Sequence, residues 1–249
     1  MVIVLSTLFI SVKVLADVDV KTNTKSVEVL SPEATEEWEP KVAMVKPSPV
    51  PSDAVILFNG SDLNQWQHND GKPAAWLINQ NKSFTLVSGA GRLQTKDSFC
   101  DVQLHIEWRS PNKISGKSGQ QLGNSGIFLM ERYELQILDS YQNQTYSNGQ
   151  AGAVYKQYAP LVNATAPTGE WNTYDIIFTA PKFDQKGHLL SPAYLTALHN
   201  GVLIQNHVKI QGSTTYKGLP VYKPHGCSPI SLQDHHDEVS FRNIWLRAL

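Results

Sequence analysis

Apolar and polar residues alternate along several short stretches of this chain. Between Gln103 and Arg109, the even positions are apolar and the odd positions are polar or charged. A period of two recurs in residues 133–137, 173–179 and 239–245. Because successive side chains of a β-strand point to opposite faces, this period predicts strands with one face on a core and the other toward polar surroundings.

Clusters of turn-forming residues separate these stretches. They lie at residues 59–60, 69–71, 89–91, 148–149 and 200–201. Asn200-Gly201 stands between residues 195–198 and 202–204 and predicts a tight β-hairpin, because both residue types adopt left-handed backbone conformations. No window of useful length has a sustained helical period. We therefore expect an all-β protein, built as a sandwich or jelly roll.

Residues 1–16 form a short apolar run that ends in the small residue Ala16. The run is too short to span a bilayer and resembles the core of a signal peptide cleaved after Ala16, although the usual positively charged start is missing. The alternative is a buried first strand, which no turn residues connect to the rest. We expect an exported protein, in the periplasm, outside the cell or tethered to its surface, with no transmembrane span.

The next segment, residues 17–54, is rich in charge and proline. From Asp17 to Asp53 it holds eight acidic residues, four basic residues and five prolines, with Trp38 as its one aromatic residue. Such a stretch cannot bury enough apolar surface to offset the entropy of ordering it, so we expect a disordered linker. One folded domain is then expected over residues 55–249.

Composition narrows the partners and the redox chemistry. The 249 residues include 21 basic and 22 acidic side chains, for a formal net charge of -1. This balance gives no electrostatic reason to expect nucleic acid or an anionic membrane as a partner. The two cysteines, Cys100 and Cys227, are too few and too far apart for a disulfide framework or a CxxC zinc site. We expect two free, partly buried thiols, with pairing as the alternative in an oxidising compartment.

A polar face is expected on the strand predicted over residues 133–140. Glu134 and Gln136 would stand on the same face, about 7 Å apart. Carboxylates and amides form paired hydrogen bonds with sugar hydroxyls, so this face is suited to a carbohydrate. The alternative is a solvated sandwich face, which commonly carries Glu and Gln. Strands of matching polarity elsewhere in the chain carry Ser125, Glu107 and Gln233.

Two further groups are candidates for acid–base chemistry. If Glu107 and Arg109 line a cleft, Glu107 is a general acid or base and Arg109 a clamp for negative charge; on a surface they form an ordinary ion pair. His235, in the polar cluster at residues 229–238, is a candidate acid–base residue or metal ligand, because histidine exchanges protons near neutral pH. The alternative is an exposed loop, since the cluster lacks the ligand spacing of zinc motifs.

Small residues precede another expected strand, in Gly123-Asn124-Ser125-Gly126. They permit close approach of the backbone to a ligand or to a neighbouring strand. The run lacks the nucleophile-elbow pattern, and no phosphate loop occurs in the chain. Ser125 is therefore expected to be a binding hydroxyl or a turn residue rather than a nucleophile.

Together these motifs resemble the 3-keto-disaccharide hydrolase domain family. The resemblance covers nearly all of residues 55–248, and its strength lies in the order and spacing of many short pieces. In chain order these are residues 57–66, 99–109, 124–127, 133–140, 152–155, 169–172, 198–202, 229–235 and 239–244. Two departures stand out. His236 occupies a position where the family usually has Gly, and the segment at residues 185–192 is longer than a hairpin needs.

The resemblance implies a concanavalin A-like jelly roll and activity on glycosides oxidised at C3 of the sugar. A keto group at C3 acidifies the C2 proton, so that a base can remove it and the glycosidic oxygen can leave C1 by β-elimination; water then adds, for net hydrolysis. The site needs a base, a stabiliser of the enediolate and a proton donor. We expect Glu134 or His235 as base, Glu107 as donor, and Arg109 or a divalent metal ion at the enediolate.

The sugar itself needs binding groups, and no cofactor other than that metal ion enters this hypothesis. Aromatic side chains stack on the apolar face of a sugar ring, and amides bind its hydroxyls. The residues expected to bind the substrate are Gln136, Gln233, Ser125, Tyr155 and Trp171.

Two other functions remain open. An ordinary glucanase on this fold needs two carboxyl groups roughly 5 Å apart, commonly in an ExDxE strand. The strand here has Gln136 where the middle acid would lie, which places this function second. A lectin-like carbohydrate-binding module is the other alternative, because fold does not fix function. Convergence of Glu107, Glu134 and His235 in one site would favour an enzyme over the binding module.

Overall fold

The computed structural model describes residues 31, 34, 36–37, 41–46, 48–112 and 116–249. Residues 45–249 form one compact unit, and the strands lie within it. The signal peptide expected over residues 1–16 lies outside the described residues, as does most of the linker expected over residues 17–54. The boundary at residue 55 stays a prediction.

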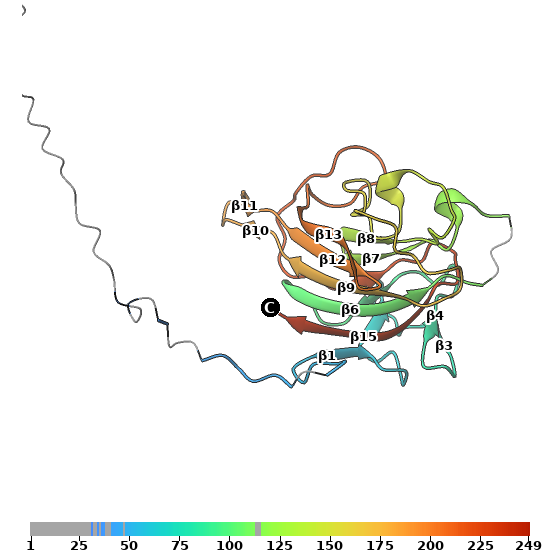
Figure 1. Ribbon diagram of the computed structural model, residues 1–249, viewed down its shortest axis with the longest axis horizontal. Coiled ribbons are helices and arrows are strands. Elements are labelled where there is room, and N and C mark those ends of the chain that lie inside the picture. The colour runs from blue at the N-terminus through green and yellow to red at the C-terminus, as the bar shows by residue number, and fades with distance from the viewer. Residues whose placement is uncertain (1–30, 32–33, 35, 38–40, 47, 113–115) are drawn as a thin grey trace, which may run out of the picture. The chain divides into compact units, whose positions relative to one another are not determined.

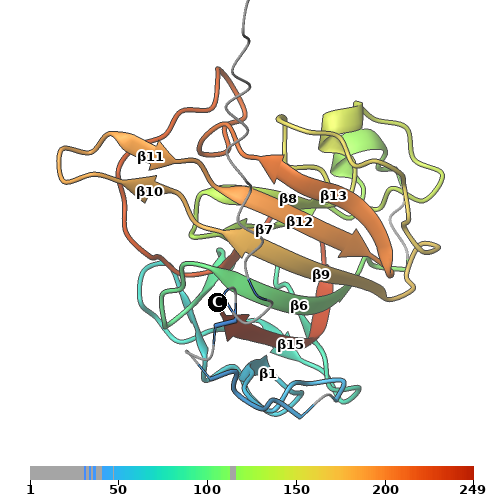
Figure 2. The same cartoon turned by 60° about the vertical axis from the view of Figure 1, so that its left-hand side comes forward.

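Nearly all regular structure in residues 45–249 is antiparallel β-sheet, which confirms the all-β prediction (Figure 1). The larger sheet has eight strands, in the order β13 (Val202–Lys209), β12 (Tyr194–His199), β9 (Asn172–Thr179), β6 (Val102–Arg109), β15 (Ser240–Ala248), β4 (Phe84–Thr85) and β3 (Leu77–Ile78), with β1 (Val55–Phe58) also paired to β15. The second sheet has five strands, in the order β2 (Trp66–His68), β5 (Leu93–Thr95), β14 (Ser231–Leu232), β7 (Ser125–Leu129) and β8 (Tyr133–Ile137). In Figure 2, β13, β12, β9, β6 and β15 run side by side as one curved layer.

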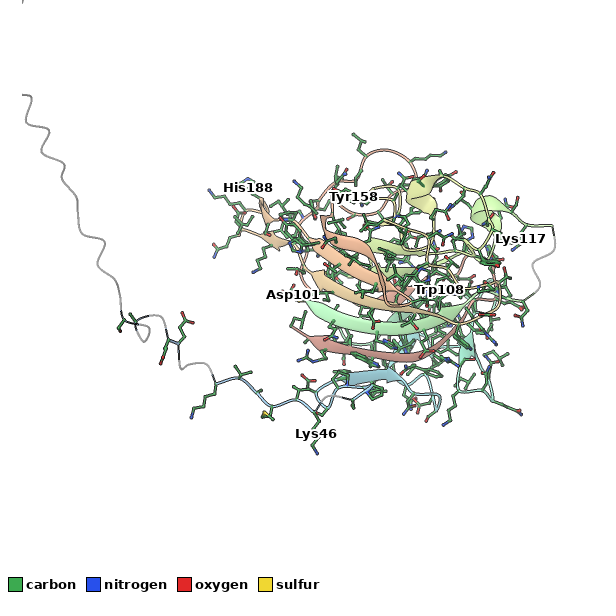
Figure 3. The ribbon with its side chains drawn as sticks, in the orientation of Figure 1. Lys46, Asp101, Trp108, Lys117, Tyr158 and His188 are labelled. Carbon is green, nitrogen blue, oxygen red and sulfur yellow. A yellow bond between two sulfur atoms is a disulfide. The ribbon has the colours of Figure 1, made fainter. Side chains whose placement is uncertain are left out.

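The core lies between these two sheets. In β6 the even-numbered residues are buried and the odd-numbered ones are partly exposed, as the alternation predicts. The buried Tyr133 ring of β8 contacts the Phe178 ring of β9, with centroids 5.7 Å apart. Trp108 lies within the body of the sandwich (Figure 3). The inner face of each sheet is therefore the one that carries these large apolar side chains, and the polar residues of β6 and β8 point outward, on opposite surfaces.

β8 differs from the prediction in two ways. It ends at Ile137 instead of residue 140, because the backbone N–H of Asp139 leaves the ladder and donates to the carbonyl of Leu122 at 2.9 Å. All five residues of β8 are also buried, although the alternation predicts one exposed face. Loops from later in the chain cover the outer face of β8. The alternation within a strand predicts where its side chains point, but it does not predict whether a distant loop covers them.

The hairpin predicted at Asn200-Gly201 is confirmed. Asn200 and Gly201 have φ of 51° and 77° and join β12 to β13. The long segment at residues 185–192 lies in a second hairpin, formed by β10 (Lys182–Phe183) and β11 (Leu189–Ser191). This hairpin projects from the side of the sandwich and carries His188 near its end (Figures 1 and 3).

The expectation of two free thiols is wrong, because Cys100 and Cys227 form a disulfide. An isolated antiparallel bridge pairs Phe99 with Ser228, and the residues next to this pair are the two cysteines. Their Cα atoms are 4.7 Å apart although 127 positions separate them in sequence. Sequence separation gave no measure of this proximity, which arises from the packing of two loops.

Short 3-10 turns supplement the strands at η2 (Gly119–Gln121) and η3 (Ser147–Gly149). Among the residues that the structure describes, none of the helices has the length and apolar character needed to cross a bilayer.

Candidate active site

A cavity of about 270 Å³ lies on the outer face of the five-stranded sheet, at its β8 edge. Its volume is close to the lower end of the range for small-molecule sites, about 300 to 1,000 Å³. The residues that line it are Asn124, Phe128, Glu134, Gln136, Tyr155, Thr214, Tyr216, Gln233 and His235. Five of the predicted site residues thus meet in one place: Glu134, Gln136, Tyr155, Gln233 and His235.

Neighbouring strands set the position of Glu134. In the ladder between β7 and β8, Glu134 lies opposite Phe128, and Gln136 lies opposite Gly126. A Cβ atom at Gly126 would lie 2.5 Å from Oε1 of Glu134, so the carboxyl group occupies the space that a larger residue would fill. The small residues predicted to permit close approach therefore make room for the candidate catalytic side chain.

The electrostatic environment of Glu134 is unusual for a carboxyl group. Its side chain lines the cavity, yet the residue is only 4% exposed. Burial raises the pKa of Glu134 to about 8, because the charged form loses its hydration. No Lys, Arg or His among the described residues forms an ion pair with it. At neutral pH the group is mainly a protonated acid that can donate a hydrogen bond or a proton.

Amide side chains surround this acid. Oε1 of Gln136 and Oε1 of Gln233 are buried and accept no hydrogen bond from the described residues. The Nε2 group of Gln136 makes only long contacts, 3.4 Å to Asn124 and 3.5 Å to Gln120. A buried acceptor without a partner costs about 1–3 kcal/mol, which a ligand hydroxyl could recover. The cavity is therefore equipped to bind a polyol such as a sugar.

His235 belongs to a loop that is fixed at both ends. Before it, the backbone N–H of Gln233 donates to the carbonyl of Gly126 at 2.9 Å. After it, the buried Asp237 accepts a hydrogen bond from the backbone of Asn124 at 2.8 Å and forms an ion pair with Lys117. These contacts hold the exposed His235 at the rim of the cavity.

The departure at His236 has a conformational explanation. His236 has φ of 65°, in the left-handed region that glycine adopts without strain. Its Nδ1 lies 3.3 Å from Oγ of Ser88, and its backbone N–H donates to Asp234 at 2.9 Å. The loop that carries His235 therefore has the turn that a glycine would favour.

The remaining cavity wall comes from segments far along the chain. The backbone N–H of Tyr155 donates to the carbonyl of Glu134 at 3.1 Å, so residues 152–155 run along the edge of β8. Thr214 also contacts the backbone of Glu134, because its Oγ1 accepts a hydrogen bond from the Glu134 N–H at 3.0 Å. The Tyr155 hydroxyl contacts that of Tyr146 at 2.8 Å, and burial, followed by this contact, raises the pKa of Tyr155 above its ordinary value.

Ser125 takes part in the structure beside the cavity but does not line it. Its residue is buried, and its Oγ donates to the carbonyl of Gln233 at 2.8 Å. The bond joins β7 to the segment that follows β14. Ser125 thus positions Gln233 rather than presenting a hydroxyl to a ligand.

The expected convergence of Glu107 with Glu134 and His235 is not observed. Glu107 lies on β6, on the outer face of the eight-stranded sheet, whereas Glu134 faces outward from the other sheet. Its carboxylate is held by Arg242, at 2.6 Å from Nε, and by Asn243, at 2.8 Å from Nδ2. Glu107 therefore cannot donate a proton in the cavity.

Arg109 and Trp171 belong to the same outer surface as Glu107. The Arg109 guanidinium lies 4.8 Å from the Trp171 ring centroid, and that of Arg242 lies 4.1 Å from it. Neither Arg109 nor Trp171 lines the cavity. They form a stacked cluster on the larger sheet, so the roles expected for them in binding sugar and stabilising charge do not fit this structure.

Four lining residues were absent from the prediction: Asn124, Phe128, Thr214 and Tyr216. The alternation of β7 could have identified Phe128, because Phe128 shares a face with Gly126 and lies opposite Glu134. Thr214 and Tyr216 come from an irregular loop between β13 and β14, and no periodic signal indicates where such a loop folds.

In the part of the chain that the structure describes, no group of three or more His, Cys, Asp or Glu side chains is arranged to hold a metal ion. Glu134 and His235 are the two residues of the cavity with ligand chemistry of that kind.

Comparison with known proteins identifies the family of this chain. It is similar to a 3-keto-disaccharide hydrolase of Bacteroides thetaiotaomicron, with 24% identity over 81% of this chain and 80% of that protein. A crystal structure from Parabacteroides distasonis, described as a candidate glycosyl hydrolase, has a TM-score of 0.84 and 45% identity over 88% of this chain and 97% of its own. A second structure so described, from the same organism, shares the fold, with a TM-score of 0.57 and 19% identity over 79% of this chain and 94% of its own. Residues 53–247 match the model of one sequence family, and the chain belongs to the 3-keto-alpha-glucoside-1,2-lyase-like domain family.

Proposed function

We propose that this protein cleaves the glycosidic bond of 3-keto-glycosides by elimination followed by addition of water. The observation that carries the proposal is a single buried carboxyl group, Glu134, with a pKa of about 8 in a cavity otherwise lined by amides, hydroxyls, aromatic rings and His235. The names of its relatives, a 3-keto-disaccharide hydrolase and a 3-keto-alpha-glucoside-1,2-lyase-like domain, support the same chemistry.

The geometry supports a revised division of roles. His235 at the rim takes the C2 proton, and the electron pair of that C–H bond forms a C2–C3 enolate with its charge on the C3 oxygen. The enolate then collapses to the C3 ketone, its electron pair forms the C1–C2 double bond, and the C1–O bond breaks. Glu134, protonated at neutral pH, gives its proton to the departing oxygen. Amide N–H groups of Gln136 and Gln233 are the donors available to the enolate oxygen. Water then adds across the double bond and restores the keto sugar.

An ordinary glycosidase is less consistent with this site. Retaining and inverting enzymes use two carboxyl groups that flank the scissile bond. Glu134 is the one carboxylate among the described residues that line the cavity. Asp237 contacts the backbone of the lining residue Asn124 but does not line the cavity itself, and Lys117 binds its carboxylate.

A lectin-like module is the second candidate, and the position of Glu107 favours it, because a third acid–base group does not reach the cavity.

The enzyme and the lectin-like module differ in turnover. Incubation with methyl glucoside and with methyl 3-keto-glucoside, each with and without a chelator, separates them. Cleavage of the keto sugar alone supports elimination, cleavage of the unoxidised sugar supports a glycosidase, and binding without turnover supports the lectin.

Two matched variants test the assignment of Glu134. We expect Glu134→Gln to lower kcat on methyl 3-keto-glucoside by about 100-fold or more, because the amide cannot donate a proton to the leaving oxygen. Glu107→Gln makes the same chemical change on the opposite surface and should retain turnover within a few-fold. Steady-state kinetics of both purified variants is the measurement. Full turnover by Glu134→Gln, or a large loss in Glu107→Gln alone, would overturn the assignment.

We also propose that the protein is exported. The disulfide between Cys100 and Cys227 supports this, because disulfides persist in oxidising compartments and are rare in the cytosol. The apolar run at residues 1–16 is consistent with it. Quantitative alkylation of both cysteines, without reductant, in protein isolated from its native cells would contradict the proposal.

A further inference from the structure

The cavity around Glu134 has room for about one sugar ring. Its volume of about 270 Å³ falls just below the range typical of sites for drug-sized ligands, about 300 to 1,000 Å³. A substrate with two sugar units therefore extends beyond this cavity. The part that extends is the leaving group, because the ring that reacts must lie beside Glu134 and His235.

A second cavity of about 470 Å³ adjoins the first. It is lined by Tyr146, Asn148, Lys156, Tyr216 and Gly218, and Tyr216 lines both cavities. Tyr155, which lines the first cavity, also contacts Tyr146 of the second through their hydroxyl groups. Three further cavities, of about 410, 430 and 480 Å³, share no lining residue with the cavity around Glu134.

The chemistry of this second cavity fits a sugar. The Lys156 ammonium lies 4.3 Å from the ring centroid of Tyr216 and 5.5 Å from that of Tyr146. It donates to the carbonyl of Tyr216 at 3.0 Å, and among the described residues it has no carboxylate partner. The ammonium thus keeps donors for a ligand oxygen. Tyrosine rings offer flat apolar surfaces with polar edges, which suit the two kinds of surface on a pyranose.

We propose that Tyr146, Lys156 and Tyr216 form the subsite that binds the leaving sugar unit of a 3-keto-disaccharide. The inference rests on the proposed cleavage of 3-keto-glycosides. In that reaction the C1–O bond breaks, its electron pair stays on the oxygen of the second unit, and this oxygen takes the proton of Glu134. The second unit then departs across Tyr216. These residues set the preference for a disaccharide over a simple alkyl glycoside.

The test compares two substrates on the full-length protein: a 3-keto-disaccharide and methyl 3-keto-glucoside. The readout is the ratio of their kcat/KM values, which cancels any change common to both. We expect Tyr146→Ala and Lys156→Met each to lower this ratio about tenfold, through a higher KM for the disaccharide. Tyr146→Phe keeps the ring while removing the hydroxyl contact to Tyr155, and should preserve most of the ratio.

Tyr141→Ala is the matched control, because Tyr141 is 39% exposed and Tyr146 is 40% exposed, yet Tyr141 lines neither cavity. It should leave the ratio at the wild-type value. An unchanged ratio in both Tyr146→Ala and Lys156→Met, with turnover intact, would overturn the subsite and leave the proposed function standing. Failure of the wild-type protein to cleave either keto sugar would overturn the proposed function and the subsite with it.

Discussion

At the scale of a single residue, the proton on Glu134 links the site to the stability of the protein. Burial raises the pKa of Glu134 to about 8 from an ordinary value of 4.5, so the folded protein retains a proton that the unfolded chain loses in this interval. Stability falls with rising pH wherever the folded state binds more protons. The contribution of Glu134 is therefore complete below about pH 4.5 and is lost as the pH rises to about 8.

The variant Glu134→Gln isolates this effect. Glutamine does not ionise, so we expect the unfolding free energy of Glu134→Gln, minus that of the wild type, to grow from pH 5 to pH 8.5 in favour of the variant. Other titrating groups, such as the buried His199 whose pKa is lowered to about 4 by burial, act equally in both proteins and cancel. Denaturant unfolding at several pH values measures the difference. A difference that stays constant over this range would show that Glu134 titrates normally.

At the scale of the elements, β7 and β8 together position the acid. The ladder sets Gly126 beside Glu134, and a Cβ at Gly126 would lie 2.5 Å from Oε1 and 3.1 Å from Cγ. We expect Gly126→Ala to displace the carboxyl group and to lower kcat on methyl 3-keto-glucoside by about 100-fold, since a shift of about 1 Å in a catalytic group has an effect of this size. Steady-state kinetics and a melting curve of the variant are the measurements.

Gly226→Ala supplies the control for this change. A Cβ at Gly226 meets no atom within 4 Å, so this variant should keep the kinetics of the wild type. Wild-type kcat in Gly126→Ala would mean that the carboxyl group does not depend on the space above β7. A collapse of the melting transition in Gly126→Ala would instead assign the glycine to folding.

At the scale of the whole molecule, the disulfide closes a long loop. Cys100 and Cys227 are 127 positions apart, and the segment before Cys227 carries Thr214 and Tyr216 to the cavity. A cross-link over a loop of this length restricts the unfolded chain, with an effect of about 4 kcal/mol. We expect reduction of the wild type, and the double variant Cys100→Ser/Cys227→Ser, to lower the unfolding free energy by about that amount. Denaturant titrations with and without reductant measure it, and coincident curves would contradict the expectation.

The sequence by itself determined the longer strands and one face of the site. The period of two determined which residues of β6 face the core and which residues of β8 face the cavity, because side-chain direction in a strand follows local geometry. The same rule placed Glu134 and Gln136 side by side, and turn chemistry located the hairpin at Asn200-Gly201. These features depend on neighbours in the chain, so a pattern of neighbours predicts them.

The tertiary structure alone decided what meets that face. Glu107 lies on the larger sheet and binds Arg242, which is 135 positions away in the sequence. Both features depend on the order of the strands in the sheet. The pairing of Cys100 with Cys227 and the arrival of Thr214 and Tyr216 at the cavity depend on how loops pack. The raised pKa of Glu134 also follows from that packing, because burial by distant segments removes the water that stabilises a carboxylate.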